Sequence, residues 1–304
     1  SVSADGNALT LGKYTLDENE VAYLNGNKFF QRHAFIGGST GSGKSWTTAK
    51  IIEQMSGLAT ANAIVFDLHG EYAPLTGAGI QHFKVAGPAD VEAKSTISDD
   101  VLYLPYWLLS YEALVSMFVD RSDQNAPNQA MIMAREINQA KKKYLEDNGQ
   151  HDLLKHFTVD SPVPFDLYFL LEQLNSINVE MVPGAKAGTE KQGDFFGKLA
   201  RMISRLENKI SDRRLGFMFN GGEDILDFAW LEKFASAVLG SRDENGKAGI
   251  KIINFSEVPS DVLPLIVSLV ARVTFSVQQW TPSELRHPIA QRWSHLFEQL
   301  KAYL

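Results

Sequence analysis

An eight-residue glycine-rich segment, Gly38–Ser45, constrains the fold of this chain more than any other feature. It reads G-S-T-G-S-G-K-S and matches the pattern G-x-x-x-x-G-K-[ST], with a short apolar run at Ala34–Ile36 before it and a helical pattern at Trp46–Met55 after it. Glycines let such a loop curl so that its backbone N–H groups point at phosphate oxygens, and the following helix adds its positive N-terminal end. The sequence therefore predicts a phosphate-binding loop between a strand and a helix, and an ordinary glycine turn is the alternative.

The residues of this loop have separate expected roles. Lys44 is expected to reach the β- and γ-phosphates and to act in catalysis, and the Ser45 hydroxyl is expected to coordinate a metal ion. The cofactors expected from this pattern are ATP and Mg²⁺. The predicted nucleotide-binding residues are Gly38, Ser39, Thr40, Gly41, Ser42, Gly43, Lys44, Ser45 and Trp46.

The pattern of apolar residues predicts an α/β fold in which strands alternate with helices around a parallel sheet. The strands are expected at Ala34–Ile36, Ala63–Phe66, His82–Val85, Val101–Tyr106 and Lys251–Phe255. Between them, apolar residues at helical spacing predict a helical insertion, so that one core is split in two. The expected parts are a strand and turn segment (1–30), the core (31–108 and 250–290), the insertion (109–249) and an amphipathic C-terminal helix (291–304).

An acidic stretch follows the second predicted strand. Asp67 ends that strand and Glu71 comes four residues later, in the run D-L-H-G-E-Y. Because α/β sheets bind ligands at the carboxyl ends of their strands, either carboxylate is a candidate for holding a Mg²⁺-bound water or polarising the attacking one. The alternative is that Asp67 caps a turn and Glu71 is solvated. His69, between them, is expected to be structural.

Several of these motifs together resemble a known family. R-H-A-F-I-G-G-S-T-G-S-G-K-S (Arg32–Ser45) and I-V-F-D-L-H-G-E-Y (Ile64–Tyr72) are similar to the HerA family of the HerA/FtsK motor superfamily, as are D-R-R-L-G-F-M-F (Asp212–Phe219) and the stretch Ile252–Arg272. The resemblance runs from about residue 10 to about residue 290. It implies a RecA-like P-loop NTPase core with a parallel-dominated sheet and a helical insertion.

The resemblance also implies an activity and partners. Members of the family form homo-oligomeric, hexameric rings that hydrolyse ATP to pull double-stranded DNA through the centre, and work with a nuclease such as NurA or with another antiphage-defence effector. From the resemblance we expect residues 1–30 to be only the exit strand of the family's N-terminal β-barrel, with most of that barrel absent. In this reading Lys44, Glu71 and Arg32 are the catalytic residues, and Ser45 and Asp67 bind the metal. The arginine offered to a neighbouring subunit is one of four candidates by motif position, of which Arg32 is preferred over Arg213, Arg214 and Arg272.

One departure from the family pattern concerns the Walker B strand, whose acidic pair activates the attacking water. His287–Ala290 resembles the start of such a strand, but Gln291–Trp293 follows directly and no acidic pair comes after it. Two interpretations remain open. Either the chain binds ATP and hydrolyses it poorly, or the sequence omits residues between Ala290 and Gln291.

A basic stripe is the candidate DNA-binding surface. Residues 191–214 contain seven basic and three acidic residues, and four of the basic ones recur at helical spacing. On a pore wall such a stripe contacts phosphates without reading sequence, and a solvated amphipathic face is the alternative. The predicted DNA-binding residues are Lys198, Arg201, Arg205 and Lys209.

Other basic and aromatic residues are expected to have structural roles. The run Lys141–Lys143 is expected to be solvated, and Arg272 is expected to cap or pair inside the core. The aromatic residues expected in the core are Tyr103, Tyr106 and Trp107.

Composition limits the remaining function classes. The formal charge is −7, so a DNA contact must be local, and the absence of cysteine excludes disulfides and thiolate metal sites. A cytoplasmic location without membrane contact is expected. The leading hypothesis is an ATP-driven DNA translocase. A nucleotide-binding ring scaffold for an effector is the second, and a kinase of small metabolites, which shares the phosphate loop, is the third.

Overall fold

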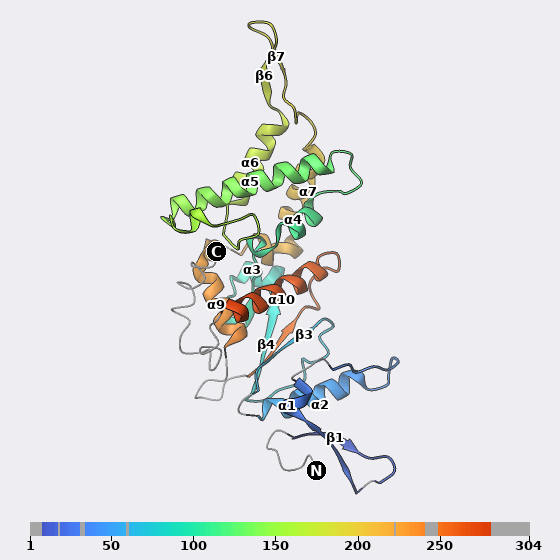
Figure 1. Cartoon of the computed structure of the whole chain (residues 1–304). Coiled ribbons are helices and arrows are strands. Elements are labelled where there is room, and N and C mark those ends of the chain that lie inside the picture. Colours follow the sequence, from blue (N-terminus) through green and yellow to red (C-terminus); the bar gives the residue numbers. More distant parts are fainter. Residues whose placement is uncertain are drawn as a thin grey trace. The chain divides into compact units, whose positions relative to one another are not determined.

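The computed structural model of this chain describes residues 8–17, 19–30, 34–58, 61–221, 223–240 and 249–280 (Figure 1). These residues form two compact units, which are treated separately below. Among the described residues, the first runs as far as Lys84 and resumes at Val238–Ser256, and the second consists of Val85–Ala237 and residues 257–280. The expected core (31–108 and 250–290) and insertion (109–249) have other boundaries and remain a proposal.

A parallel sheet organises the first unit. Strands β3 (Ala63–Asp67), β8 (Ile250–Asn254) and β4 (Ile80–Val85) pair in that order, and both pairings are parallel. In Figure 1 the orange arrow of β8 lies beside β3 and β4, although it comes from a distant part of the sequence. The predicted α/β class with a parallel-dominated sheet is therefore confirmed.

The central strand β8 has the composition of a strand that is covered on both faces. Ile250, Ile252 and Ile253 are fully buried, as expected for a near-continuous apolar run inside a parallel sheet. Lys251 is buried as well, and its ammonium donates to the Asn62 side-chain oxygen at 3.1 Å and to the Gly240 carbonyl. Burial lowers the pKa of Lys251 to about 8.

A helix and a hairpin complete the first unit. Helix α2 (Lys44–Ser56) buries Ile51, Ile52 and Met55 in a cluster with Ile250 and Ile252. The antiparallel strands β1 (Ala8–Lys13) and β2 (Val21–Asn25) and the short helix α1 (Gly26–Phe30) precede it.

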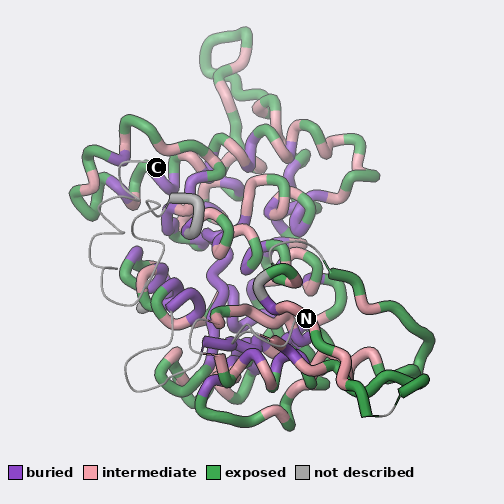
Figure 2. The backbone as a smooth tube through the Cα atoms, turned by 60° about the horizontal axis from the view of Figure 1, so that its bottom comes forward, coloured by how far each residue is buried: buried purple, intermediate pink, exposed green. Residues whose placement is uncertain are grey.

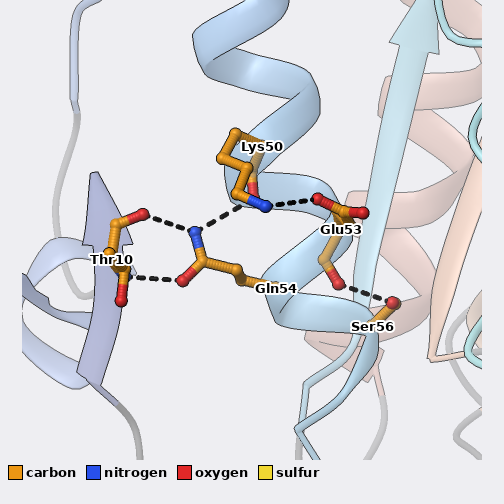
Figure 3. A network of polar contacts seen from close by, with 5 residues as sticks. All are labelled: Thr10, Lys50, Glu53, Gln54 and Ser56. Carbon is orange, nitrogen blue, oxygen red and sulfur yellow. Dashed lines mark hydrogen bonds and ion pairs between the residues drawn. The ribbon is translucent and has the colours of Figure 1, made fainter. Parts of the chain in front are cut away.

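The Gln54 side chain ties this hairpin to α2. Its oxygen accepts the Thr10 N–H at 2.5 Å and its nitrogen donates to the Thr10 carbonyl at 2.6 Å (Figure 3). Lys50, one turn earlier, instead forms an exposed ion pair with Glu53 at 2.8 Å. The helix that begins at the phosphate loop is thus anchored on β1 by its last turns.

Two expected strands differ in the structure. Ala34–Ile36 is not a strand, and the Phe35 side chain is 93% exposed, so its apolar run is not buried in a ladder. The strand expected at Val101–Tyr106 is limited to the two residues of β5 (Val101–Leu102), and a 3₁₀ turn occupies Tyr106–Leu108. Pro105 has no N–H to donate to a ladder, and the Leu104 N–H donates to Phe217 instead, which ends the strand early.

The second unit is mainly helical. Its helices are α3 (Pro88–Ala93), α4 (Tyr111–Phe118), α5 (Ala126–Asp147), α6 (Leu167–Asn178), α7 (Ala200–Ser211), α8 (Gly216–Phe219), α9 (Phe228–Leu239) and α10 (Leu263–Trp280). Short 3₁₀ turns lie at Ile97–Asp99, Leu153–Lys155, Arg213–Leu215 and Glu223–Leu226. Buried and exposed positions alternate along the helices, as the purple and green segments of Figure 2 show. Tyr103, Tyr106 and Trp107 are at most 7% exposed, which confirms them as core residues.

A hairpin that the sequence analysis did not predict interrupts the helices. Strands β6 (Met181–Pro183) and β7 (Glu190–Gln192) pair antiparallel between α6 and α7, and nearly all of their residues are exposed. Each strand has only three residues and little apolar alternation, so the pattern that identifies longer strands is missing.

Some expectations lie beyond what the structure describes. Arg32, the segment His287–Ala290 and the helix expected over 291–304 fall outside the described residues. Among the described residues, no helix combines the length and the apolar character needed to cross a membrane. The same residues contain no group of three or more histidine, aspartate or glutamate side chains arranged to hold a metal ion.

Candidate functional site: the phosphate loop and the β3 turn

The phosphate loop closes tightly in front of α2. Gly41 and Gly43 have φ angles of +79° and +89°, a region that side-chain-bearing residues rarely adopt, and the Ser42 N–H donates to the Ser39 carbonyl at 3.2 Å. A Cβ atom on Gly38 would lie 2.2 Å from the Ser42 Oγ, so a side chain there would force Ser42 to move. The backbone of the loop therefore favours glycine at positions 41 and 43, and close packing favours it at position 38.

Two polar side chains from the first turn of α2 lie at this loop. The Lys44 ammonium donates to the Ser39 carbonyl at 2.7 Å, which places the cation within the curl of the loop. The Ser45 hydroxyl donates to the Glu71 carboxylate at 3.0 Å. Helix α2 is 13 residues long, so its N-terminus presents N–H groups and a positive partial charge beside both side chains.

Asp67 organises the turn that carries Glu71. Asp67 is 2% exposed, and its two carboxylate oxygens accept the N–H groups of Glu71 and Tyr72, each at 3.0 Å. Gly70, with φ +72°, provides the reversal. The turn-closing role that the sequence left open for Asp67 is therefore present, and the turn directs Glu71 toward Ser45. Assignment of Asp67 as a metal ligand remains a proposal.

The arrangement fits a magnesium nucleotide. Asp67 ends β3 and pairs in register with Asn254 at the end of β8, so the turn lies at the carboxyl edge of the sheet. Ser45 and Glu71 place a hydroxyl and a carboxylate, ligands that Mg²⁺ prefers, next to the cradle formed by the loop. Trp46 is 80% exposed, and its assignment to nucleotide binding remains a proposal.

The predicted basic stripe lies on and just before α7, and most of its charges are paired. Arg201 and Arg205 both reach the Asp120 carboxylate, at 3.0 and 3.7 Å, and Lys209 pairs with Asp261 at 2.6 Å. The hydroxyl and the N–H of Ser122 and the two arginines lower the pKa of Asp120. The opposite face of α7 is buried, which confirms the amphipathic pattern. Lys198 is exposed, and it makes no ion pair with the residues that the structure describes.

Two other basic side chains serve the core. Arg272 donates to the Leu108 carbonyl, as predicted for a cation inside an apolar helix. The expectation that the run Lys141–Lys143 is solvated is wrong for Lys141, which is fully buried and donates to the Val159 and Ser161 carbonyls at 2.6 Å each. Lys141 is buried because it lies on the inner face of α5, whereas Lys142 and Lys143 face outward.

The chain matches the family model described as the central domain of helicase HerA, over residues 9–273. The chain belongs to the HerA central-domain family. The match includes the phosphate loop, the β3 turn, α7 and most of α10, so the HerA domain contains every described residue discussed above as a site candidate. No curated protein matches the chain.

Proposed function

We propose that this HerA-family chain is the ATPase subunit of a homo-oligomeric, hexameric ring that translocates double-stranded DNA. The observation that carries the proposal is the hydrogen bond between Ser45 and Glu71, because it joins the phosphate loop to a carboxylate at the edge of the sheet. The family match supports the motor class. A nuclease or another antiphage-defence effector is proposed as the partner, and the cytoplasm as the location.

The residues at the loop have separate proposed roles in ATP hydrolysis. The N–H groups of the loop and the Lys44 ammonium bind phosphate oxygens and stabilise the negative charge that develops on them. Ser45 would hold Mg²⁺, which would neutralise charge on the phosphates, and Asp67, which keeps the β3 turn in shape, is the second proposed metal ligand. Glu71 is proposed to orient and deprotonate the attacking water. Arg32 is proposed to reach the nucleotide of a neighbouring subunit.

Replacing Glu71 with glutamine is expected to lower ATP turnover by roughly 100-fold, while ATP affinity changes little. The amide oxygen still accepts the Ser45 hydroxyl but cannot take up a proton. Glu53→Gln in α2 is the matched control, because that exposed carboxylate forms its ion pair with Lys50, away from the loop, among the residues that the structure describes. Full turnover in Glu71→Gln, measured by phosphate release, would show that the carboxylate only positions Ser45.

Replacing Asp120 with asparagine is expected to raise the affinity for double-stranded DNA roughly three- to tenfold at low salt. The change frees Arg201 and Arg205 for phosphate contacts. The slope of log affinity against log salt concentration should therefore steepen by the amount expected for about one to two additional phosphate contacts. Asp152→Asn is the matched control, since it removes the same charge from the exposed pair with Lys155. If both variants show equal salt slopes, the stripe on α7 is a solvated face.

The proposed function is tested by ATP turnover with and without double-stranded DNA, together with native mass. Stimulation by duplex DNA and a mass of six subunits in the presence of ATP and Mg²⁺ are expected. If neither single-stranded DNA nor duplex DNA changes the rate of ATP turnover, the result contradicts a translocase.

A nucleotide-binding ring scaffold is the second candidate. The pairing of Arg201, Arg205 and Lys209 with carboxylates favours it, because a neutralised stripe attracts DNA weakly. A scaffold should bind ATP and its effector with the turnover rate unaffected by DNA, so the same measurements separate the two functions.

A further inference from the structure

The second unit contains a cavity that is unrelated to the phosphate loop. Its volume is about 550 Å³, within the range of about 300–1,000 Å³ that is typical of small-molecule sites. The walls come from the loop between α3 and β5, from β5 and the residues after it, from the end of α8 and from α9. The residues used below are Lys94, Ser95, Ser98, Tyr103, Trp230 and Lys233.

The loop that forms one wall has a residue with a left-handed backbone conformation at each end. Lys94 (φ +53°) and Asp100 (φ +60°) are the two non-glycine residues with positive φ in the described part of the chain. Lys94 also ends α3 as its C-cap, a place where glycine is favoured because it has no Cβ. The lysine at this position places a long cationic side chain at the cavity, although its backbone conformation is unfavourable for a residue with a Cβ. Residues in such sparsely populated backbone conformations are concentrated at ligand sites and other functional sites.

Two lysines at this cavity are without a described ion pair. Lys94 and Lys233 are both exposed, and neither lies within salt-bridge distance of an acid among the described residues. Asp99 and Asp90, the acids near Lys94 in the sequence, accept hydrogen bonds from Thr96 and from the Gly87 N–H instead, which does not remove their charge. The cavity therefore has two ammonium groups that an anionic ligand could contact.

Hydroxyls and aromatic rings complete the lining. Ser95 and Ser98 add hydroxyl groups to the same wall as Lys94. Tyr103 and Trp230 line the cavity with largely buried rings, each 7% exposed, and Trp230 stacks on Phe234 with ring centroids 5.2 Å apart. Aromatic rings and ammonium groups in one cavity are suited to a planar ring that carries an anionic group.

We propose that this cavity binds a small phosphorylated molecule with a planar ring. The phosphate contacts Lys94 and Lys233, Ser95 and Ser98 donate to its oxygens, and the ring lies on Tyr103 and Trp230. The site is separate from the nucleotide that the phosphate loop is proposed to hydrolyse.

The test is calorimetric titration of the full chain carrying Lys44→Ala, which disables the phosphate loop, with AMP and with adenosine as the neutral analogue. We expect AMP to bind at least tenfold more tightly than adenosine. Equal binding of AMP and adenosine, or no binding of AMP at millimolar concentration, would overturn the proposal.

Lys94→Gly, added to Lys44→Ala, separates ligand contact from folding. Glycine relieves the left-handed backbone, so the melting temperature should hold or rise, whereas the affinity for AMP should fall at least tenfold. Lys155→Ala is the matched control, because it removes the same charge from an exposed site outside the cavity. Lys233→Ala should weaken the binding of AMP in the same way as Lys94→Gly. If Lys94→Gly binds AMP as well as Lys155→Ala does, the cavity is not the site.

Discussion

Replacing Lys44 with alanine is expected to lower ATP turnover by roughly 1,000-fold and to weaken ATP binding. The ammonium lies inside the loop, 2.7 Å from the Ser39 carbonyl, at the N-terminal end of α2. Its removal takes away the only full positive charge that the described part of the loop offers to a phosphate. The measurements are phosphate release at saturating ATP and the dissociation constant of a fluorescent ATP analogue.

The matched control is Lys50→Ala in the same helix. Lys50 is exposed and pairs with Glu53 at 2.8 Å, away from the loop, so its loss changes the net charge by the same amount. Turnover within about twofold of wild type is expected, because exposed ion pairs contribute little to stability. Equal turnover in Lys44→Ala and wild type would contradict the assignment of this loop as the nucleotide site.

The candidate site could be located from the sequence because its parts are short and local. The spacing of G-S-T-G-S-G-K-S fixes Lys44 and Ser45 at a helix start, and D-L-H-G-E-Y follows the next strand directly. The structure brings Ser45 and Glu71 to 3.0 Å, as expected for groups at the carboxyl edge of one sheet. The sequence left both Asp67 and Glu71 open as candidates, because no local pattern shows that both Asp67 oxygens accept N–H groups of the turn.

Other features depended on contacts that no local pattern encodes. Asp120 meets Arg201 and Arg205 across about 80 residues of sequence, so the charge of the stripe could not be judged from α7 alone. The strand expected at Ala34–Ile36 failed because a three-residue apolar run does not reveal whether a partner strand is present.

Lys141 is the clearest case of a residue whose environment the sequence hides. It stands between similar lysines, yet its ammonium is fully buried, bonded to two carbonyls, and 5.8 Å from the centre of the Phe165 ring. The pKa of Lys141 is lowered to about 7, mainly by burial; the Asp160 charge opposes this shift, and the Arg272 charge adds to it. Both carbonyls lie in the segment Val159–Ser161, so this one side chain fixes a loop to α5.

The stability of the chain should therefore rise with pH through the action of Lys141. Between about pH 7, its pKa in the folded chain, and the usual lysine value of 10.5, the unfolded chain keeps a proton that the folded chain has released. Unfolding then takes up a proton, so the free energy of unfolding increases with pH by up to about 1.4 kcal/mol per unit in this window and is flat below it.

Lys141→Met isolates this contribution, because methionine has a similar length and does not titrate. Its two former acceptors lose their donor, which should cost roughly 1–3 kcal/mol for each carbonyl left unpaired. The difference in unfolding free energy between wild type and Lys141→Met, from urea titrations between pH 6 and 10, should widen in favour of wild type above about pH 7. Lys142→Met is the matched control, because that side chain is 62% exposed and pairs with Glu146 at 3.7 Å, so its difference from wild type should stay nearly constant. A difference for Lys141→Met that is equally constant would mean that Lys141 keeps its proton in the folded chain, and that the two carbonyls hold an ammonium at every pH in this range.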